Sequence, residues 1–292
     1  MMNTITLTPQ MLQRPALPWE ITDAIIDHLH SDIRALGVCS SICSEWLIRS
    51  RHHIFSTVQL WPWRVRRFFD LASQQNCTFT SHVSRIEVDD SRARSNGKAS
   101  WRSGLEGLEG SDEVRFSDAM SQSDAPCLAQ VKTIQVRNVD WTALSSTEQA
   151  VLRERLAKFS KLNRLEFQDV VFHDLREVVR IVGSFPILQH LTANVSFMKY
   201  LEHTVASAVT LELSSNLHSV EIGTDDAIPV VLSCIAACDG PEHVRGLQLR
   251  NIKQNHLQYV HRMLKKSGKN IQNLMLDFSY ERCSWIGQGM YH

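Results

Sequence analysis

The sequence has no excess of either charge, no long apolar run and no even set of cysteines. Its 292 residues include 31 Lys and Arg and 31 Asp and Glu, so no long-range field favours nucleic acid or an anionic membrane as the main partner. The most apolar stretch, 227–238, contains Pro229 and covers barely half of the roughly 20 residues that a membrane-spanning helix needs. We therefore expect no nucleic-acid partner and no membrane span.

Secretion is also not expected. The first ten residues carry neither the basic region nor the continuous apolar region of a secretory signal. Seven cysteines, an odd number spread along the chain, suit buried thiols in a reducing compartment better than a disulfide framework. We expect a cytoplasmic or nuclear protein.

The motifs of common enzymes are missing. There is no Gly-rich phosphate loop, no nucleophile elbow and no His-Glu-x-x-His. Cys39 with Cys43, and Cys234 with Cys238, could each share a helix face, but no further ligands at matching spacing complete a zinc site. We expect no catalytic residues, no metal and no cofactor. The alternative from this class is an enzyme with a site between repeats and loop, which a cofactor in the purified protein would reveal.

Four regions differ in composition, and a hydrophobic content of 43% is ample for a packed core. Residues 17–60 have a helical pattern, and residues 61–90 form a junction and a first repeat. Residues 91–126 are rich in Ser, Gly and charge, which predicts a disordered loop or, alternatively, a docking segment. Residues 127–292 alternate short strands with helices. For the basic and aromatic stretch 61–69 we expect packing at the junction rather than stacking on single-stranded nucleic acid.

A repeated pattern runs through the last part of the chain. Seven segments share the frame apolar-x-x-apolar-x-apolar; they begin at Val83, Val131, Leu162, Leu188, Leu217, Val244 and Ile271. From the second onward they recur at intervals of roughly 25 to 30 residues, and the pieces between them carry helix signals such as the capping boxes 146–149 and 174–177 and the helix end at Gly268. One strand and one helix per period of this length is typical of leucine-rich-repeat solenoids.

These segments resemble leucine-rich repeats, which implies a curved stack with parallel strands on its concave side. The fold class we predict is therefore α/β, with a parallel sheet. The positions where that family places Asn or Cys are here Val139, Val170, Ser196, Asp225, Ile252 and Ser279. The buried Asn ladder is thus missing, and we predict degenerate repeats.

Side chains between the frame residues should point to the concave face, because strand side chains alternate. This predicts a candidate substrate face made of Arg137, Glu166, Gln168, Asn194, Glu221, Gln248, Arg250 and Asp277. The mixed charges suggest a protein ligand. The alternative is a sheet face that is merely solvated.

The front of the chain predicts three short helices. Leu17, Ile21, Ile25 and Leu29 recur at every fourth position and give one apolar helix face. Pro18 suits the first position of that helix. The second and third helices follow, with the apolar residues Ile33, Leu36, Val38, Ile42, Cys43, Trp46, Leu47 and Ile54. Three helices in about 40 residues bury only a small core, and modules of that size often need a partner.

The same residues resemble a known motif. Leu17-Pro18-x-Glu20-Ile21-x-x-x-Ile25-x-x-x-Leu29, Cys39-Ser40-x-Ile42-Cys43-x-x-Trp46 and Arg49-Ser50-Arg51-x-x-Ile54-Phe55 resemble, in order, the F-box, a three-helix motif. They depart from it at Ser44, where a basic residue is common, and at Gly37 inside the second helix. The resemblance implies adaptor contacts at Leu17, Pro18, Ile21, Ile25 and Leu29, and a core that includes Leu36, Ile42, Cys43, Trp46 and Phe55.

The F-box resemblance also implies a function. F-box proteins dock on the Skp-type adaptor of a cullin-RING ubiquitin ligase, while their C-terminal domain holds a protein substrate. We therefore expect a non-enzymatic, substrate-recruiting subunit. The alternative is an F-box and repeat scaffold that binds the adaptor for a non-proteolytic assembly role.

Overall fold

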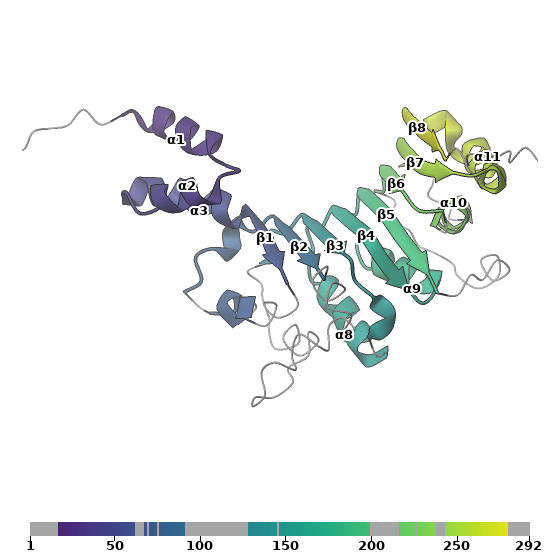
Figure 1. Ribbon diagram of the computed structural model, residues 1–292, viewed down its shortest axis with the longest axis horizontal. Coiled ribbons are helices and arrows are strands. Elements are labelled where there is room, and N and C mark those ends of the chain that lie inside the picture. Colours follow the sequence, from purple (N-terminus) through teal and green to yellow (C-terminus); the bar gives the residue numbers. More distant parts are fainter. Residues whose placement is uncertain are drawn as a thin grey trace, which may run out of the picture. The chain divides into compact units, whose positions relative to one another are not determined.

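The chain forms two compact units, Met1–Ser56 and Thr57–His292. The computed structural model (Figure 1) describes residues 17–61, 67–68, 70–74, 76–90, 128–144, 146–198, 216–225, 227–237 and 243–279. Most of the stretch 61–69 and all of the predicted loop 91–126 lie outside the described residues.

The first unit contains three helices in its described part, where the sequence predicted three. They are α1 (Trp19–His28), α2 (Ile33–Cys39) and α3 (Ser44–Ser56), and α1 and α2 each pack on α3. Asp32 caps α2, because its Oδ1 accepts hydrogen bonds from the backbone N–H groups of Arg34 and Ala35 at 3.0 and 2.9 Å. This cap fixes the start of α2 about one turn before the buried Leu36 and two turns before the buried Cys39.

The second unit is built on one parallel sheet. Its described strands, in chain order and also in spatial order, are β1 (Thr57–Leu60), β2 (Arg85–Asp89), β3 (Thr133–Arg137), β4 (Arg164–Phe172), β5 (His190–Phe197), β6 (Ser219–Ile222), β7 (Gly246–Ile252) and β8 (Asn273–Phe278). Because β1 pairs with β2, residues 57–60 belong to the sheet of the second unit.

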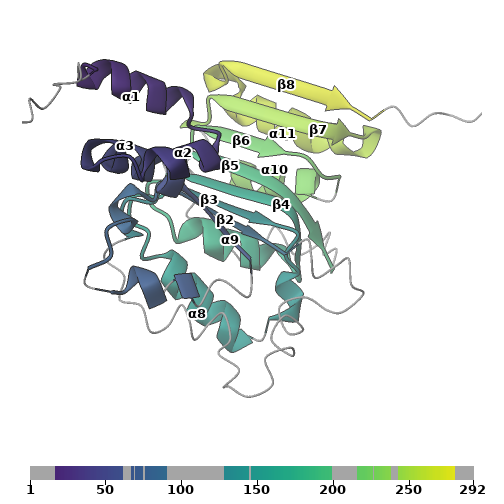
Figure 2. The same cartoon turned by 60° about the vertical axis from the view of Figure 1, so that its left-hand side comes forward.

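Helices connect the strands and lie along one face of the sheet (Figures 1 and 2). The described ones are α8 (Ser146–Leu156), α9 (Leu175–Gly183), α10 (Ala227–Ala237) and α11 (Leu257–Ser267), with short 3-10 turns at Thr80–His82, Trp141–Ala143, Gln254–His256 and Gly268–Asn270. A parallel sheet in sequential order, with a helix in most of the crossovers, is consistent with a leucine-rich-repeat-like solenoid.

One of the two predicted capping boxes is well defined at α9. Asp174 Oδ1 accepts from the backbone N–H groups of Arg176 and Glu177 at 2.8 and 3.3 Å, and Glu177 Oε2 accepts in return from the backbone N–H of His173 at 3.0 Å. The first turn of α9 is therefore held on both sides, which sets the helix with Val178, Val179, Ile181 and Val182 against the core.

The predicted frames meet each other in register across the sheet. The middle apolar residue of each frame pairs with its counterpart on the next strand, so that one row holds Ile86, Ile134, Leu165, Leu191, Val220, Leu247 and Leu274. Val58 on β1, which belongs to no predicted frame, extends this row. The frames from Val83 to Leu249 are buried as predicted and join one continuous core. The frame on β8 differs, because Leu274 is 47% exposed.

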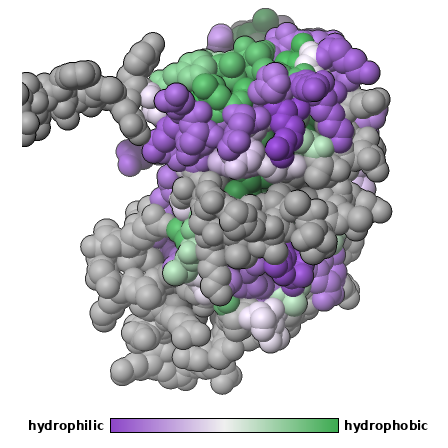
Figure 3. All heavy atoms as spheres, turned by 90° about the vertical axis from the view of Figure 1, so that its right-hand side faces the viewer, coloured by the Kyte–Doolittle hydropathy of each residue, from purple (hydrophilic) through white to green (hydrophobic). Residues whose placement is uncertain are grey.

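The last described strand leaves apolar residues open. Leu274, Met275 and Phe278 on β8 are between 46% and 57% exposed, since no described strand or helix follows to cover them. Figure 3, which looks at this end of the second unit, shows an apolar area near the top, where β8 lies. The sequence prediction that the frame on β8 is buried is therefore wrong for Leu274.

Three left-handed residues, which the sequence did not predict, lie directly after β3 or inside β4 and β7, where the register shifts. Asn138, Asp169 and Asn251 have φ values of 56°, 55° and 57°, a conformation that Asn and Asp tolerate better than most residues. Asn138 Nδ2 donates to Asp89 Oδ1 at 3.0 Å, and Asn251 Nδ2 donates to the carbonyl oxygen of Gly223 at 2.8 Å. These side chains connect adjacent repeats.

Apolar residues occupy the positions of the missing Asn ladder, directly after the three left-handed residues. Val139, Val170 and Ile252 stand where the leucine-rich-repeat family places Asn or Cys, and each is at most 1% exposed. They extend the apolar core by one layer. The polar link between repeats has moved one residue earlier, to the left-handed position.

Truncating one frame residue tests this packing. We expect Leu247→Ala to lower the free energy of unfolding by about 2–5 kcal/mol, because Leu247 is 2% exposed and its removal leaves a cavity. Leu274→Ala is the matched control: it stands beside Leu247 in the register but is 47% exposed, so we expect a loss below about 1 kcal/mol. Urea unfolding followed by circular dichroism measures both. Equal losses would contradict an open β8.

Candidate protein-interaction surfaces

The predicted apolar face of α1 points away from the helical core. We call Leu17, Pro18, Ile21, Ile25 and Leu29 the α1 face. Leu17, Ile21 and Ile25 are 59%, 50% and 41% exposed, Pro18 is exposed and Leu29 is half-buried. The helix instead buries its other side, through Thr22 and Ile26. A helix that packs with one side and exposes aliphatic side chains on another is typical of a partner surface.

More large apolar residues of the first unit are exposed. Trp19, Ile33, Val38, Ile42 and Ile48 are each between 57% and 71% exposed. Single exposed apolar residues are normal on proteins, but a unit of this size with so many of them has much apolar surface left for another molecule.

The predicted core of the first unit is only partly correct. Leu36 is fully buried, and Trp46 and Phe55 are half-buried. Ile42 and Cys43 were predicted in the core, but Ile42 is 57% exposed and Cys43 is exposed. The reason is that α2 ends at Cys39 and α3 begins at Ser44, so both residues lie in the turn between them. Cys39 and Ser50 are buried in their place.

A charged cluster joins α1 to α3. Asp27 on α1 accepts from Arg49 Nε at 2.7 Å and from Arg49 Nη2 at 2.6 Å, and His53 Nε2 lies 2.7 Å from the same carboxylate. The hydrogen bond from Arg49, followed by that from His53, holds the pKa of Asp27 well below its ordinary value. Sequence reasoning missed this cluster, because no local spacing relates Asp27 to two residues more than twenty positions away.

The outward face of the sheet is polar and largely paired with itself. Glu166 lies 3.0 Å from Arg85 Nη2 and 2.7 Å from Arg164 Nε, and Arg85 also contacts Glu87 at 2.8 Å and Gln135 Oε1 at 2.6 Å. Gln135 and Glu166 are 1% and 7% exposed. Burial acts to lower the pKa of Arg85, but hydrogen bonds and the charges of Glu87 and Glu166 outweigh it and leave that pKa raised.

The predicted substrate face is therefore not uniform. Glu166 is buried beneath two arginines; Arg137, Gln168, Asn194, Glu221 and Gln248 are half-buried; Arg250 and Asp277 are exposed. Arg137 Nη2 donates to Gln135 Oε1 at 2.8 Å, and Arg250 pairs with Glu221 at 2.7 Å. All eight lie on strands of one sheet. Those near the middle of the sheet contact neighbouring polar side chains of the same face, so they are less available to a partner than Arg250 and Asp277.

Asn194 packs tightly against the next repeat. A Cβ atom added at Gly223 would lie 1.7 Å from Asn194 Oδ1, so only glycine fits beside this side chain. The Asn194 Oδ1 atom is buried and has no hydrogen-bond partner among the described residues. Asn194 therefore packs in the contact between β5 and β6, and contributes little to the exposed polar face of the sheet.

The described ranges contain neither a metal-binding cluster nor a membrane-spanning helix. No group of three or more His, Cys, Asp or Glu side chains there could hold a metal ion. None of the helices in the described ranges is both long enough and apolar enough to cross a membrane.

Comparison with known proteins assigns no family. No family model matches the sequence, and no curated protein matches it. Among solved structures, an internalin (inlF) from Listeria monocytogenes is similar over 86% of this chain and 74% of that chain, with 12% sequence identity and a TM-score of 0.26. A TM-score of this size is too low to indicate function, so the description of the second unit follows from its own strand order and register.

The Asp27 cluster predicts an acid-dependent loss of stability in the first unit. A carboxylate whose pKa is lower in the folded than in the unfolded chain stabilises the fold above the unfolded pKa of about 3.9, and this contribution is lost as the pH falls below that value. Since 42% of the Asp27 side chain is exposed, we expect Asp27→Asn to cost about 1 kcal/mol or less near pH 6.

Hydrogen exchange of the α1 amides in the full chain measures this effect. We expect Asp27→Asn to exchange faster than wild type at pH 6, and the difference between the two proteins to shrink below about pH 4. Asp23→Asn, which removes the same charge one turn earlier in the same helix, should stay close to wild type. A pH-independent difference for Asp27→Asn would show that its carboxylate charge does not hold α1.

Proposed function

We propose that the chain is a substrate-recruiting F-box subunit of a Skp-cullin-RING ubiquitin ligase. The observation that carries the proposal is the α1 face: four of the five residues that resemble the adaptor-contacting part of the F-box motif are exposed on or beside α1, while Thr22 and Ile26 form the buried side of the helix. An exposed aliphatic helix face of this kind gains free energy when a partner covers it.

The second unit supplies the other half of the proposal. It is a parallel sheet whose outward face is polar and bears both charges, and such a face suits recognition of a protein surface. The chain would act through proximity. It holds a substrate near the charged ubiquitin carrier and raises the local concentration of the reacting groups, and contributes no acid, base or nucleophile. A ligase subunit of this kind works in the cytoplasm or nucleus.

Binding to a Skp-type adaptor tests the proposal. We expect the full chain and the adaptor to elute as a stoichiometric complex in size-exclusion chromatography. Ile21→Asp/Ile25→Asp should weaken binding by at least about 30-fold, because it places two charges on the α1 face where the partner excludes water. Both residues are exposed, so the variant should keep its fold, which circular dichroism checks.

Met198→Asp is the matched control. Met198 is 65% exposed and lies in the second unit, directly after β5, so an aspartate is placed on an exposed apolar residue away from α1. We expect wild-type adaptor binding. A folded Ile21→Asp/Ile25→Asp variant that still binds the adaptor, or a wild-type chain that ignores it, would overturn the proposal.

A scaffold that binds the adaptor without ubiquitin transfer would pass the same binding test. The proteins that the second unit captures in cells distinguish this scaffold role from the role of a substrate-recruiting ligase subunit. If inhibition of the proteasome raises the level of such a partner, the chain recruits substrates for degradation; if every captured partner is unchanged, the assembly role is favoured.

A further inference from the structure

The starts of the strands carry a row of basic and histidine side chains. At the first position of each strand from β2 to β8, or directly before it, stand Ser84, Arg85, Lys132, Thr133, Asn163, Arg164, Gln189, His190, His218, Ser219, Arg245, Gly246, Gln272 and Asn273. None of them is acidic, although the whole chain has equal numbers of acidic and basic residues. We call Arg85, Lys132, Arg164, His190, His218 and Arg245 the basic row.

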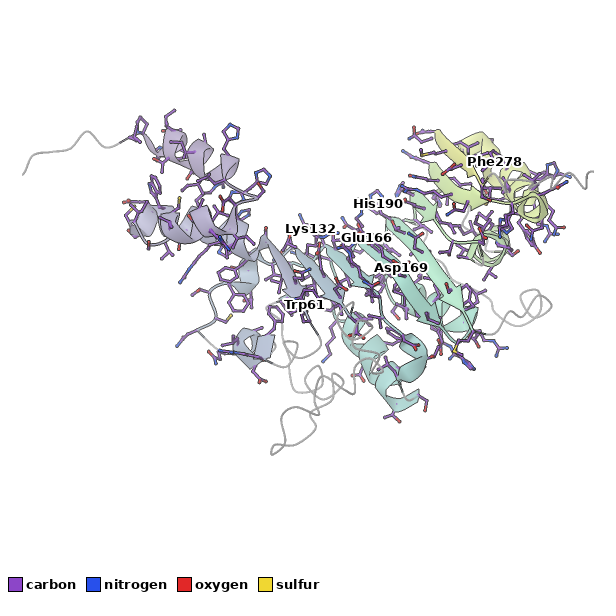
Figure 4. All side chains as sticks on the ribbon, in the orientation of Figure 1. Trp61, Lys132, Glu166, Asp169, His190 and Phe278 are labelled. Atoms are coloured by element: carbon purple, nitrogen blue, oxygen red, sulfur yellow. The ribbon has the colours of Figure 1, made fainter. Side chains whose placement is uncertain are left out.

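The register places these residues on two neighbouring levels of the sheet: Arg85, Arg164 and His190 on one, and Lys132, His218 and Arg245 one residue earlier. Arg85, Thr133, Arg164, His190, Ser219 and Gly246 are successive partners in the strand ladder. Backbone hydrogen bonds continue the same ladder one residue earlier, from Arg164 N–H to Lys132 O at 3.0 Å and from Arg245 N–H to His218 O at 2.8 Å. In Figure 4, Lys132 and His190 lie toward the end of the sheet where strands begin, and Asp169 lies toward the other end.

The acidic residues nearest to the row are already engaged. They stand one step further along the strands, and each is within ion-pair distance of an arginine: Glu87 and Glu166 of Arg85, Glu166 also of Arg164, and Glu221 of Arg250. Lys132 on the β3 side and Arg245 on the β7 side are exposed and have no ion pair with any described residue. The basic row therefore keeps two positive charges that no described carboxylate neutralises, at Lys132 and Arg245.

The two histidines lie between these charges. His190 and His218 are half-buried. Burial, then the charge of Arg164 and that of His218, lower the pKa of His190, so this ring is neutral near pH 7 and can donate one hydrogen bond without adding repulsion. The histidines thus offer hydrogen-bond donors, and Lys132 and Arg245 on either side of them offer cations.

We infer that the basic row binds an acidic peptide segment that runs across the strands in extended form. The inference rests on the proposed function and deepens it, because it names the kind of substrate segment that the second unit would hold. From Lys132 on the β3 side to Arg245 on the β7 side there are four steps of about 4.8 Å between strands, roughly 19 Å in all. An extended peptide covers this distance with about six residues.

The engaged glutamates favour a peptide over nucleic acid. Glu87, Glu166 and Glu221 lie one row away, and they would repel the continuous negative charge of a phosphate backbone. A peptide can place carboxylates or phosphates at alternate positions over the basic row, and uncharged side chains between them. Its negative charge could come from Glu and Asp or from phosphoserine, and these two sources are separate arms of the test.

Fluorescence anisotropy with labelled octapeptides tests the inference on the full chain. The probes alternate Ala with Glu, with phosphoserine, or with Gln as the neutral reference, and a twelve-nucleotide oligo-dT is the nucleic-acid probe. We expect the Glu or the phosphoserine peptide to bind at least tenfold tighter than the Gln peptide, and the binding to weaken as salt rises. Which of the two binds better identifies the source of the charge.

Charge reversal locates the binding. Lys132→Glu/Arg245→Glu should weaken the acidic peptide at least tenfold. Lys158→Glu/Lys265→Glu makes the same change of net charge on exposed lysines after α8 and on α11, and should bind as wild type. Equal affinity in wild type and Lys132→Glu/Arg245→Glu, failure of both acidic peptides to bind, or tighter binding of oligo-dT would each overturn the inference.

The outcome is independent of the adaptor test. Lys132 and Arg245 lie in the second unit, whereas the α1 face lies in the first. If Lys132→Glu/Arg245→Glu abolishes peptide binding and still forms the adaptor complex, both proposals stand. If the adaptor complex forms but no acidic peptide binds, only the inference about the basic row fails.

Discussion

The parallel register of the apolar frames is the constraint on which the second unit depends. Ile134 stands beside Leu165, and Leu165 beside Leu191, so one apolar row runs through successive repeats. Because side chains alternate along a strand, a slip of one residue would turn a whole frame away from the helices and bring its polar neighbours into the core. The pairing of Arg85 with Thr133 shows that the register continues across the long connection between β2 and β3.

The same register also orders the charges. Frames that face the helices leave the alternate positions to the other face, so residues of equal rank on neighbouring strands become neighbours in space. The result is two adjacent rows with different properties. The inner row holds glutamates that arginines neutralise, as at Glu166, and the row at the strand starts keeps exposed cations at Lys132 and Arg245. Position within the repeat, rather than overall composition, decides what this surface can recognise.

Much of the fold could be predicted from the periodicity of apolar residues. Most errors of prediction concern features that this periodicity does not determine. The frames from Val83 to Leu249 and the three front helices follow from local patterns that burial enforces. The exposure of Ile42 and Cys43 could not be predicted, since it depends on α3 starting at Ser44. The Asp27 cluster joins residues distant in sequence, and the left-handed turns, such as the one at Asn138, leave only a single Asn or Asp as a signal.

The exposed apolar residues on β8 show where an additional repeat could be accommodated. In a stack where each repeat contacts only its neighbours, an inner strand has two partners, whereas β8 has one among the described residues. Leu274, Met275 and Phe278 already present the apolar row that another strand would continue. A further strand and helix inserted after Ser279 would cover that row without disturbing any existing pair. The end of the sheet is therefore the position where duplication of a repeat would add stability instead of strain.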